Sequence, residues 1–145
     1  MTSRVFVYGS LRRGHRAHGL MAGAAYAGQA CTRDADFVMV HFEWDAPDGY
    51  PYPGVFRAAE LGRRGAHIIG EVYEADDALL DVLDAFEAVG ADYRRENVVL
   101  DDGVDAYMYV HIVTGEAFVD FSSHLLLDDA RRTFEWVVPN QTDGA

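Results

Sequence analysis

The chain has 145 residues, and its 24 acidic and 12 basic side chains give it a formal charge of −12. This length suits one ordinary domain, the 50% hydrophobic composition argues against intrinsic disorder, and no apolar run reaches the ~18 residues of a transmembrane helix. The negative charge disfavours nucleic acids and anionic membranes as partners, because binding them requires clustered cations.

The N-terminus and the amino-acid usage exclude further classes of protein. The first residues contain too short an apolar run for a signal peptide. Cys31 is the single cysteine, which excludes an internal disulfide and a multi-cysteine zinc site. All 12 basic residues are Arg, so a Schiff-base lysine and a P-loop lysine are absent. We expect a cytoplasmic protein with one domain over residues 1–145, frayed over 140–145.

Six short segments have the β-branched and aromatic composition of strands, namely residues 5–8, 26–30, 37–42, 68–74, 94–100 and 106–113. A turn at Asp101-Asp102-Gly103 joins the last two. The prolines and glycines of residues 45–54 predict an irregular loop.

Two helices are expected. The first covers residues 76–87, where Asp76 or Asp77 can cap the N-terminus. The second begins at Ser122 or Ser123 and reaches Val137, because apolar residues recur near the helical period. Since about six strands and two helices do not alternate regularly, the sequence predicts an α+β fold, with a curled mixed sheet or small barrel flanked by helices.

The first candidate site follows the first strand, where the chain reads Tyr8-Gly9-Ser10-Leu11-Arg12-Arg13-Gly14. A glycine here can adopt backbone angles closed to other residues and lets a ligand approach the main chain. Successive N–H groups in such a turn can form a nest for a carboxylate or a phosphate. The alternative is an ordinary turn whose arginines are solvated.

The second candidate is Glu87, at the end of the first helix. It lies four residues after Leu83 and seven after Leu80, on the apolar side of that helix. Partial desolvation there would raise the pKa of its carboxyl group toward the range of a general base. Alternatively, the helix ends earlier and the Glu87 side chain faces water.

His15 and His18 have a spacing that metal ligands can adopt, but no third candidate ligand follows at a spacing typical of a metal site. We therefore do not expect these two histidines to bind a metal. Ser10 has no recognisable Ser-His-Asp context as a nucleophile.

Four segments follow one another in the order Val5-Phe6-Val7-Tyr8-Gly9-Ser10-Leu11-Arg12-Arg13-Gly14, Tyr52-Pro53-Gly54-Val55, Gly70-Glu71-Val72-Tyr73-Glu74 and Leu83-Asp84-Ala85-Phe86-Glu87, with Tyr93-Arg94-Arg95 six residues further on. In sequence and order they resemble the γ-glutamylcyclotransferase-like family, including its γ-glutamylamine cyclotransferase and AIG2-like branch. The chain departs from that pattern at His15-Arg16-Ala17-His18, where members often have Asn-His, and at Ala88, where many have Gly.

The resemblance implies a small mixed β-barrel with flanking helices and a small-molecule γ-glutamyl substrate. It implies that Glu87 is the catalytic acid/base, that the backbone of Tyr8, Gly9, Ser10 and Leu11 holds the γ-glutamyl group, and that Tyr93 lies near the pocket. The reaction would be an intramolecular aminolysis that releases 5-oxoproline without metal or cofactor.

Two other functions remain open. The same pocket could serve a non-catalytic module that binds an acidic metabolite, although such a binder gains nothing from a second carboxylate at Glu87. The acidic surface or the C-terminal segment could instead meet a protein partner. The sequence does not define the oligomeric state or the amine portion of the substrate.

Overall fold

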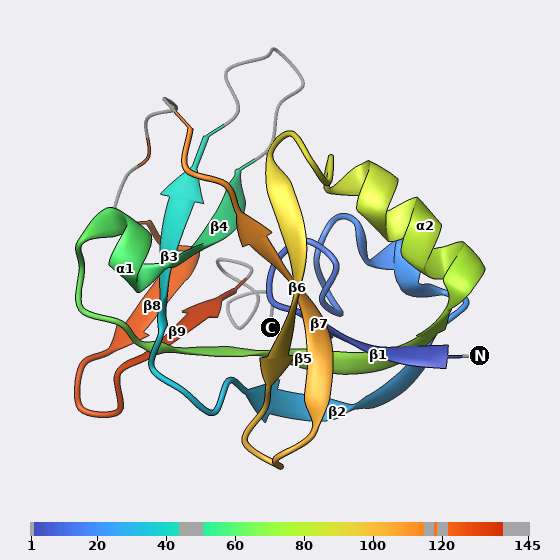
Figure 1. The fold of residues 1–145 in the computed structure, drawn as a ribbon, viewed down its shortest axis with the longest axis horizontal. Coiled ribbons are helices and arrows are strands. Elements are labelled where there is room, and N and C mark those ends of the chain that lie inside the picture. The colour runs from blue at the N-terminus through green and yellow to red at the C-terminus, as the bar shows by residue number, and fades with distance from the viewer. Residues whose placement is uncertain (1, 44–50, 115–117, 119–121, 138–145) are drawn as a thin grey trace, which may run out of the picture.

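The computed structural model describes residues 2–43, 51–114, 118 and 122–137 (Figure 1). Along the chain its elements are β1 (Thr2–Val7), the 3-10 helix η1 (His18–Met21), β2 (Ala25–Cys31), β3 (Phe37–Phe42), β4 (Tyr52–Arg57), α1 (Ala58–Leu61), β5 (His67–Asp76), α2 (Asp77–Phe86), β6 (Tyr93–Val99), β7 (Asp105–His111), β8 (Leu125–Asp128) and β9 (Thr133–Trp136).

A curled mixed sheet forms the centre of the fold. Its strands follow the order β6-β7-β1-β5-β9-β8, β2 also pairs with β5, and β3 and β4 form a separate two-stranded sheet. Strand β1 lies antiparallel to β5 and parallel to β7. In Figure 1 the long strand β5 crosses the lower half of the view, with α2 above it on the right and the β3–β4 pair above it on the left. The predicted α+β class, with a curled mixed sheet and flanking helices, is confirmed.

The central residues of β1 and β5 are buried on both faces of the sheet, because successive side chains of a strand point to opposite faces and a core covers each face. Phe6 and Val72 belong to a core that includes β3 and β4. Val5, Val7 and Tyr73 point to the opposite side, into a second core under α2 and η1. Since both faces are covered, the end of β1 is fixed by packing before the loop that follows it begins.

All six predicted strands are present, but the loop expected over residues 45–54 is wrong at its end. Tyr52, Pro53 and Gly54 open β4, which pairs with β3 over its whole length. Strand β4 tolerates a proline because, among the residues that the structure describes, its sheet has two strands and therefore a free edge. Residues 45–50 lie outside the described part of the chain.

The second predicted helix, from Ser122 or Ser123 to Val137, is wrong, since β8 and β9 form a hairpin there. The Asp128 carboxylate accepts hydrogen bonds from the N–H groups of Ala130 and Arg131. Such an Asx-type turn competes with helix formation. After the turn Phe134 and Trp136 are buried in alternation, which is the period of a strand. The frayed tail expected over 140–145 lies outside the described residues.

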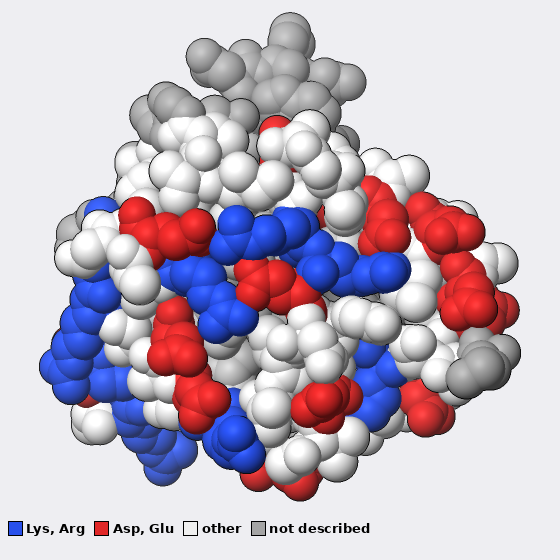
Figure 2. Space-filling model, in the orientation of Figure 1, with Lys and Arg blue, Asp and Glu red and all other residues white. Residues whose placement is uncertain are grey.

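Arginines and carboxylates interleave across the face that Figure 2 shows. Arg94 lies 2.8 Å from a Glu60 carboxylate oxygen, and Arg95 lies 2.9 Å from Asp84. This pairing differs from the clustered cations of a nucleic-acid interface. Within the described residues, no helix is long and apolar enough to cross a bilayer.

Candidate active site

A cavity of about 470 Å³ opens between the loop after β1, the start of β4, the end of α2 and the first residue of β6. Its lining includes every site residue predicted from the sequence: Tyr8, Gly9, Ser10, Leu11, Glu87 and Tyr93. The loop after β1 and the end of α2 are more than 70 residues apart in the chain, and the second core, shared by Leu11, Leu80 and Leu83, brings them together. The size suits a small molecule.

The loop after β1 offers more hydrogen-bond donors than acceptors. The Gly9 carbonyl accepts from the Arg12 N–H at 3.0 Å, and the Ser10 carbonyl accepts from the Ala17 N–H at 2.8 Å. The Leu11 carbonyl lies 3.0 Å from Nδ1 of His18. The N–H groups of Gly9, Ser10 and Leu11 meet no acceptor among the described residues. With its carbonyls occupied and these donors unused, the loop has the composition of an anion nest.

Gly9 is required for space and not for its backbone angles. Its φ lies outside the left-handed region, which Gly14 does occupy at φ 83°. A Cβ at position 9 would lie 2.5 Å from Cγ and 3.0 Å from Cδ of Pro53. The backbone freedom that a glycine offers is therefore not used at this position. The glycine lets the loop pack directly against β4.

The end of α2 places Glu87 at the cavity. The Val89 N–H donates to the Asp84 carbonyl at 3.0 Å and the Ala88 N–H to the Ala85 carbonyl at 3.2 Å. These two bonds form a Schellman motif, in which Ala88 takes the left-handed position at φ 50°. Glu87 is the C-cap residue, and its N–H still bonds the carbonyl of the fully buried Leu83. The helix does end before Glu87, but the side chain lines the cavity and is half-buried.

Ala88→Gly is expected to stabilise the protein by about 1 kcal/mol, because a left-handed alanine is strained by roughly that amount while glycine is not. Part of this gain is offset by the greater freedom of glycine in the unfolded chain. Thermal or urea unfolding measures the change. Gly23→Ala is the control. No atom lies within 4 Å of the new Cβ at position 23, so this substitution should change the stability little. Equal or lower stability of Ala88→Gly would contradict the strain.

Burial raises the pKa of the Glu87 carboxyl to about 7. Within the described residues, no ion pair or hydrogen bond joins its carboxylate to a protein group. Burial, followed by the Glu87 charge, holds the pKa of the Tyr8 hydroxyl well above its ordinary value. For Tyr93 the causes are burial, then Tyr8 and Glu87. Two neutral phenols thus lie near a carboxylate that can be protonated or ionised near neutral pH.

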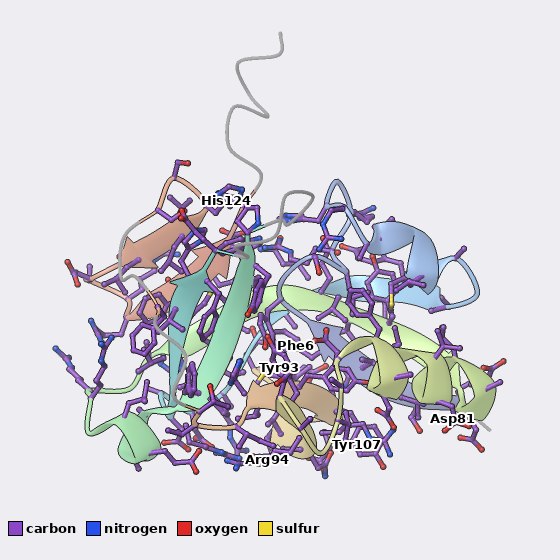
Figure 3. The ribbon with its side chains drawn as sticks, turned by 90° about the horizontal axis from the view of Figure 1, so that it is seen from above. Phe6, Asp81, Tyr93, Arg94, Tyr107 and His124 are labelled. Carbon is purple, nitrogen blue, oxygen red and sulfur yellow. The ribbon has the colours of Figure 1, made fainter. Side chains whose placement is uncertain are left out.

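The two tyrosine hydroxyls hold the walls of the cavity together. Tyr8 donates to the Tyr109 carbonyl at 2.8 Å, and Tyr93 donates to the Pro53 carbonyl at 3.1 Å. Figure 3 shows Tyr93 beside Phe6 in the interior, whereas Asp81 on α2 points away from it. Tyr93 therefore lines the cavity, while its hydroxyl group is hydrogen-bonded to β4.

The cavity also includes residues that sequence reasoning did not single out, among them Arg16, Phe86, Asp92, Tyr109 and His111. None has a spacing that marks it, because each enters the cavity through the tertiary fold. His18, considered as a metal ligand, instead braces the Leu11 carbonyl. The described residues contain no group of three side chains suited to a metal ion.

Comparison with known proteins identifies the family. Residues 5–123 match the family model described as gamma-glutamyl cyclotransferase, AIG2-like. A gamma-glutamylaminecyclotransferase from Bos taurus is 32% identical over 132 residues, which are 86% of this chain and 73% of that protein. The gamma-glutamylcyclotransferase family protein YtfP from Escherichia coli is 33% identical over 108 residues, 74% of this chain and 81% of that protein. The chain belongs to the gamma-glutamyl cyclotransferase, AIG2-like family.

Other similarities are more limited in extent. The gamma-glutamylaminecyclotransferase of Mus musculus is 32% identical over 98 residues, so the match spans only 60% of its length and 64% of this chain. The crystal structure of an AIG2-like protein from Mus musculus has a TM-score of 0.58 at 23% identity, covering 84% of this chain and 89% of that one. Kluyveromyces lactis allophanate hydrolase has a TM-score of 0.68 at 19% identity, covering 86% of this chain and 20% of that one. At these identities, both structures support the fold alone.

Proposed function

We propose that this protein is a γ-glutamyl cyclotransferase that releases 5-oxoproline and a free amine from a small γ-glutamyl compound. The observation that carries the proposal is the position of Glu87, whose pKa is raised to about 7, on the same cavity as the donor-rich loop of Gly9, Ser10 and Leu11. Relatives named as γ-glutamyl cyclotransferases support the reaction class.

In the proposed reaction the substrate supplies both the nucleophile and the carbonyl. The ionised Glu87 carboxylate takes a proton from the α-ammonium, and the freed amine attacks the γ-carbonyl of the same glutamyl group. The amide C–N bond then breaks, the leaving nitrogen receives the proton from Glu87, and a five-membered lactam remains. Water is not consumed, and the released amine takes the second ammonium proton through solvent.

Two features of the site favour this cyclisation. A cavity that holds the glutamyl chain folded removes much of the entropic barrier, for which effective molarities of ~10⁵ M or more are known. The N–H groups of the loop can stabilise either the α-carboxylate or the oxyanion that forms on the γ-carbonyl. The proposal uses no metal and no cofactor.

A substrate panel tests the proposed function. We expect 5-oxoproline, detected by chromatography, from at least one γ-glutamyl amine, γ-glutamyl amino acid or γ-glutamyl-capped small molecule. The N-acetylated form of the same compound is the matched control, because it fills the site but has no nucleophilic amine. Saturable binding without any 5-oxoproline would contradict the proposed enzyme and indicate a binding module for acidic metabolites instead.

A further inference from the structure

We infer that the β8–β9 hairpin, which lies beyond the family-matched residues 5–123, supports the proposed substrate loop, and that Arg12 is the positioning residue that connects them. The inference deepens the proposed function and concerns the same cavity. Arg12 directly follows the loop residues that line the cavity. It does not line the cavity itself, so it is not a catalytic residue.

The Arg12 side chain crosses from the loop to β9. It is 8% exposed, and its Nη1 donates to the Trp136 carbonyl at 3.0 Å. Its Nη2 donates to Oε2 of Glu135 at 3.1 Å. A guanidinium fork bound at both nitrogens has little rotational freedom, so the position of Arg12 is tied to the position of β9.

A second carboxylate, which is buried, holds the same stretch from the side of β5. Oε2 of Glu71 lies 3.7 Å from Nε of Arg12. Oε1 of Glu71 accepts hydrogen bonds from the Arg13 N–H at 3.0 Å and from the Tyr73 hydroxyl at 3.1 Å. Two consecutive loop residues are thus fixed to neighbouring strands, one by its side chain and one by its main chain. These bonds set the direction in which the preceding N–H groups point.

The hairpin is itself anchored to the sheet. Strand β9 pairs with β5 through His67↔Thr133 and Ile68↔Phe134, and Trp136 is 2% exposed. Because β5 carries both Glu71 and the pairing with β9, a single strand fixes both supports of the loop. His15 lies near this network, but burial, followed by the charge of Arg12, lowers the pKa of its imidazole to about 4, so it is neutral at physiological pH.

Removing the Glu135 charge leaves the buried guanidinium with one carboxylate fewer, and the loop loses a fixed point. Glu135→Gln is therefore expected to lower kcat/KM by about 10-fold to 10²-fold, as a small misplacement of binding groups can do. The pH at which kcat/KM rises should not move, because the surroundings of the Glu87 carboxyl group are unchanged. Asp129→Asn is the matched control: it removes a carboxylate from the turn of the same hairpin, 3.5 Å from Arg132, and should leave the kinetics within about twofold.

Hydrogen exchange gives a readout that does not depend on turnover. The hydrogen-bonded backbone amides of this loop should exchange about 10-fold faster in Glu135→Gln than in the wild type or in Asp129→Asn, since local opening becomes easier; they are the N–H groups of Arg12, Arg13, His15 and Ala17. Both measurements are made well below the unfolding midpoint of each variant. Arg12→Gln should show the same faster exchange and lower kcat/KM as Glu135→Gln. If Arg12→Gln fails to fold, Arg12→Lys, which keeps the charge without the guanidinium fork, should show the same pattern more weakly.

Each outcome has one meaning. Unchanged exchange in a folded Glu135→Gln variant overturns the support of the loop by the hairpin. Faster exchange with unchanged kcat and KM overturns the positioning role of Arg12. Faster exchange in a protein whose wild type releases no 5-oxoproline supports the structural link and rejects the proposed function, so the two failures are distinguishable.

Discussion

Glu87→Gln is expected to lower the rate of 5-oxoproline release by about 10²–10⁴-fold, the usual contribution of a general acid/base. The amide has nearly the shape of the carboxylate but cannot take a proton from the substrate ammonium. Initial rates with the best panel substrate measure the loss, and Asp81→Asn, at an exposed position of the same helix, is the control. Full activity of a folded Glu87→Gln variant would remove Glu87 from the mechanism.

The pH dependence of the wild type tests the same role. Because burial raises the pKa of Glu87 to about 7, the carboxylate required as base forms only as the pH rises through that value. The kcat/KM of the wild type should therefore increase with pH up to about pH 7 and then level off. An exposed glutamate would place this rise near pH ~4.3.

Glu87→Gln should also stabilise the folded protein at neutral pH. A carboxyl group whose pKa is raised from 4.5 to about 7 binds its proton more tightly in the folded state. Folding stability therefore falls as the pH rises from about 4.5 to 7, and Gln at position 87 avoids this loss. We expect a gain of ~1–3 kcal/mol above pH 7 that disappears below about pH 4.5. Urea unfolding at the two pH values measures it.

The sequence predicted those parts of the fold that depend on local patterns. Runs of β-branched and aromatic residues marked six strands, and apolar residues at helical spacing marked α2 with its cap at Asp76. The C-terminal hairpin was missed because Leu126, Ala130 and Phe134 also fit a helix. The turn at Asp128 is local and could compete with the helix in the sequence itself. The burial of Phe134 and Trp136 decides against the helix, and it depends on contacts with distant strands such as β5.

The candidate site could be assembled from the sequence only in part. The motif around Gly9 and the apolar side of α2 led to the loop and to Glu87 separately, and the resemblance to the family joined them. The burial of Arg12 had no local signal, since its partner Glu135 lies 123 residues away in the chain. For Gly9 the sequence suggested either special backbone angles or the close approach of a ligand, whereas the structure shows a close approach to the ring of Pro53.

Gly9→Ala is expected to lower kcat/KM by about 10²-fold or more, comparable to the loss of one oxyanion donor. The new Cβ would lie 2.5 Å from Cγ of Pro53, so either the loop or β4 has to move. A shift of the loop displaces the N–H groups of the nest. A shift of β4 moves the Pro53 carbonyl to which Tyr93 donates. Both movements disturb the cavity, and overpacking of this kind also destabilises proteins by roughly 1–3 kcal/mol.

A second-site change separates steric overlap from any other effect of the alanine. Pro53→Ala removes the Cγ and Cδ atoms that the new methyl group would meet. Gly9→Ala should therefore lower kcat/KM less in the Pro53→Ala background than in the wild type, and this difference is the recovery. Gly23→Ala, with open space around its Cβ, should leave the kinetics unchanged. Recovery assigns the loss to the contact between the loop and β4. A wild-type rate in Gly9→Ala alone would show that the loop backbone does not bind the reacting group.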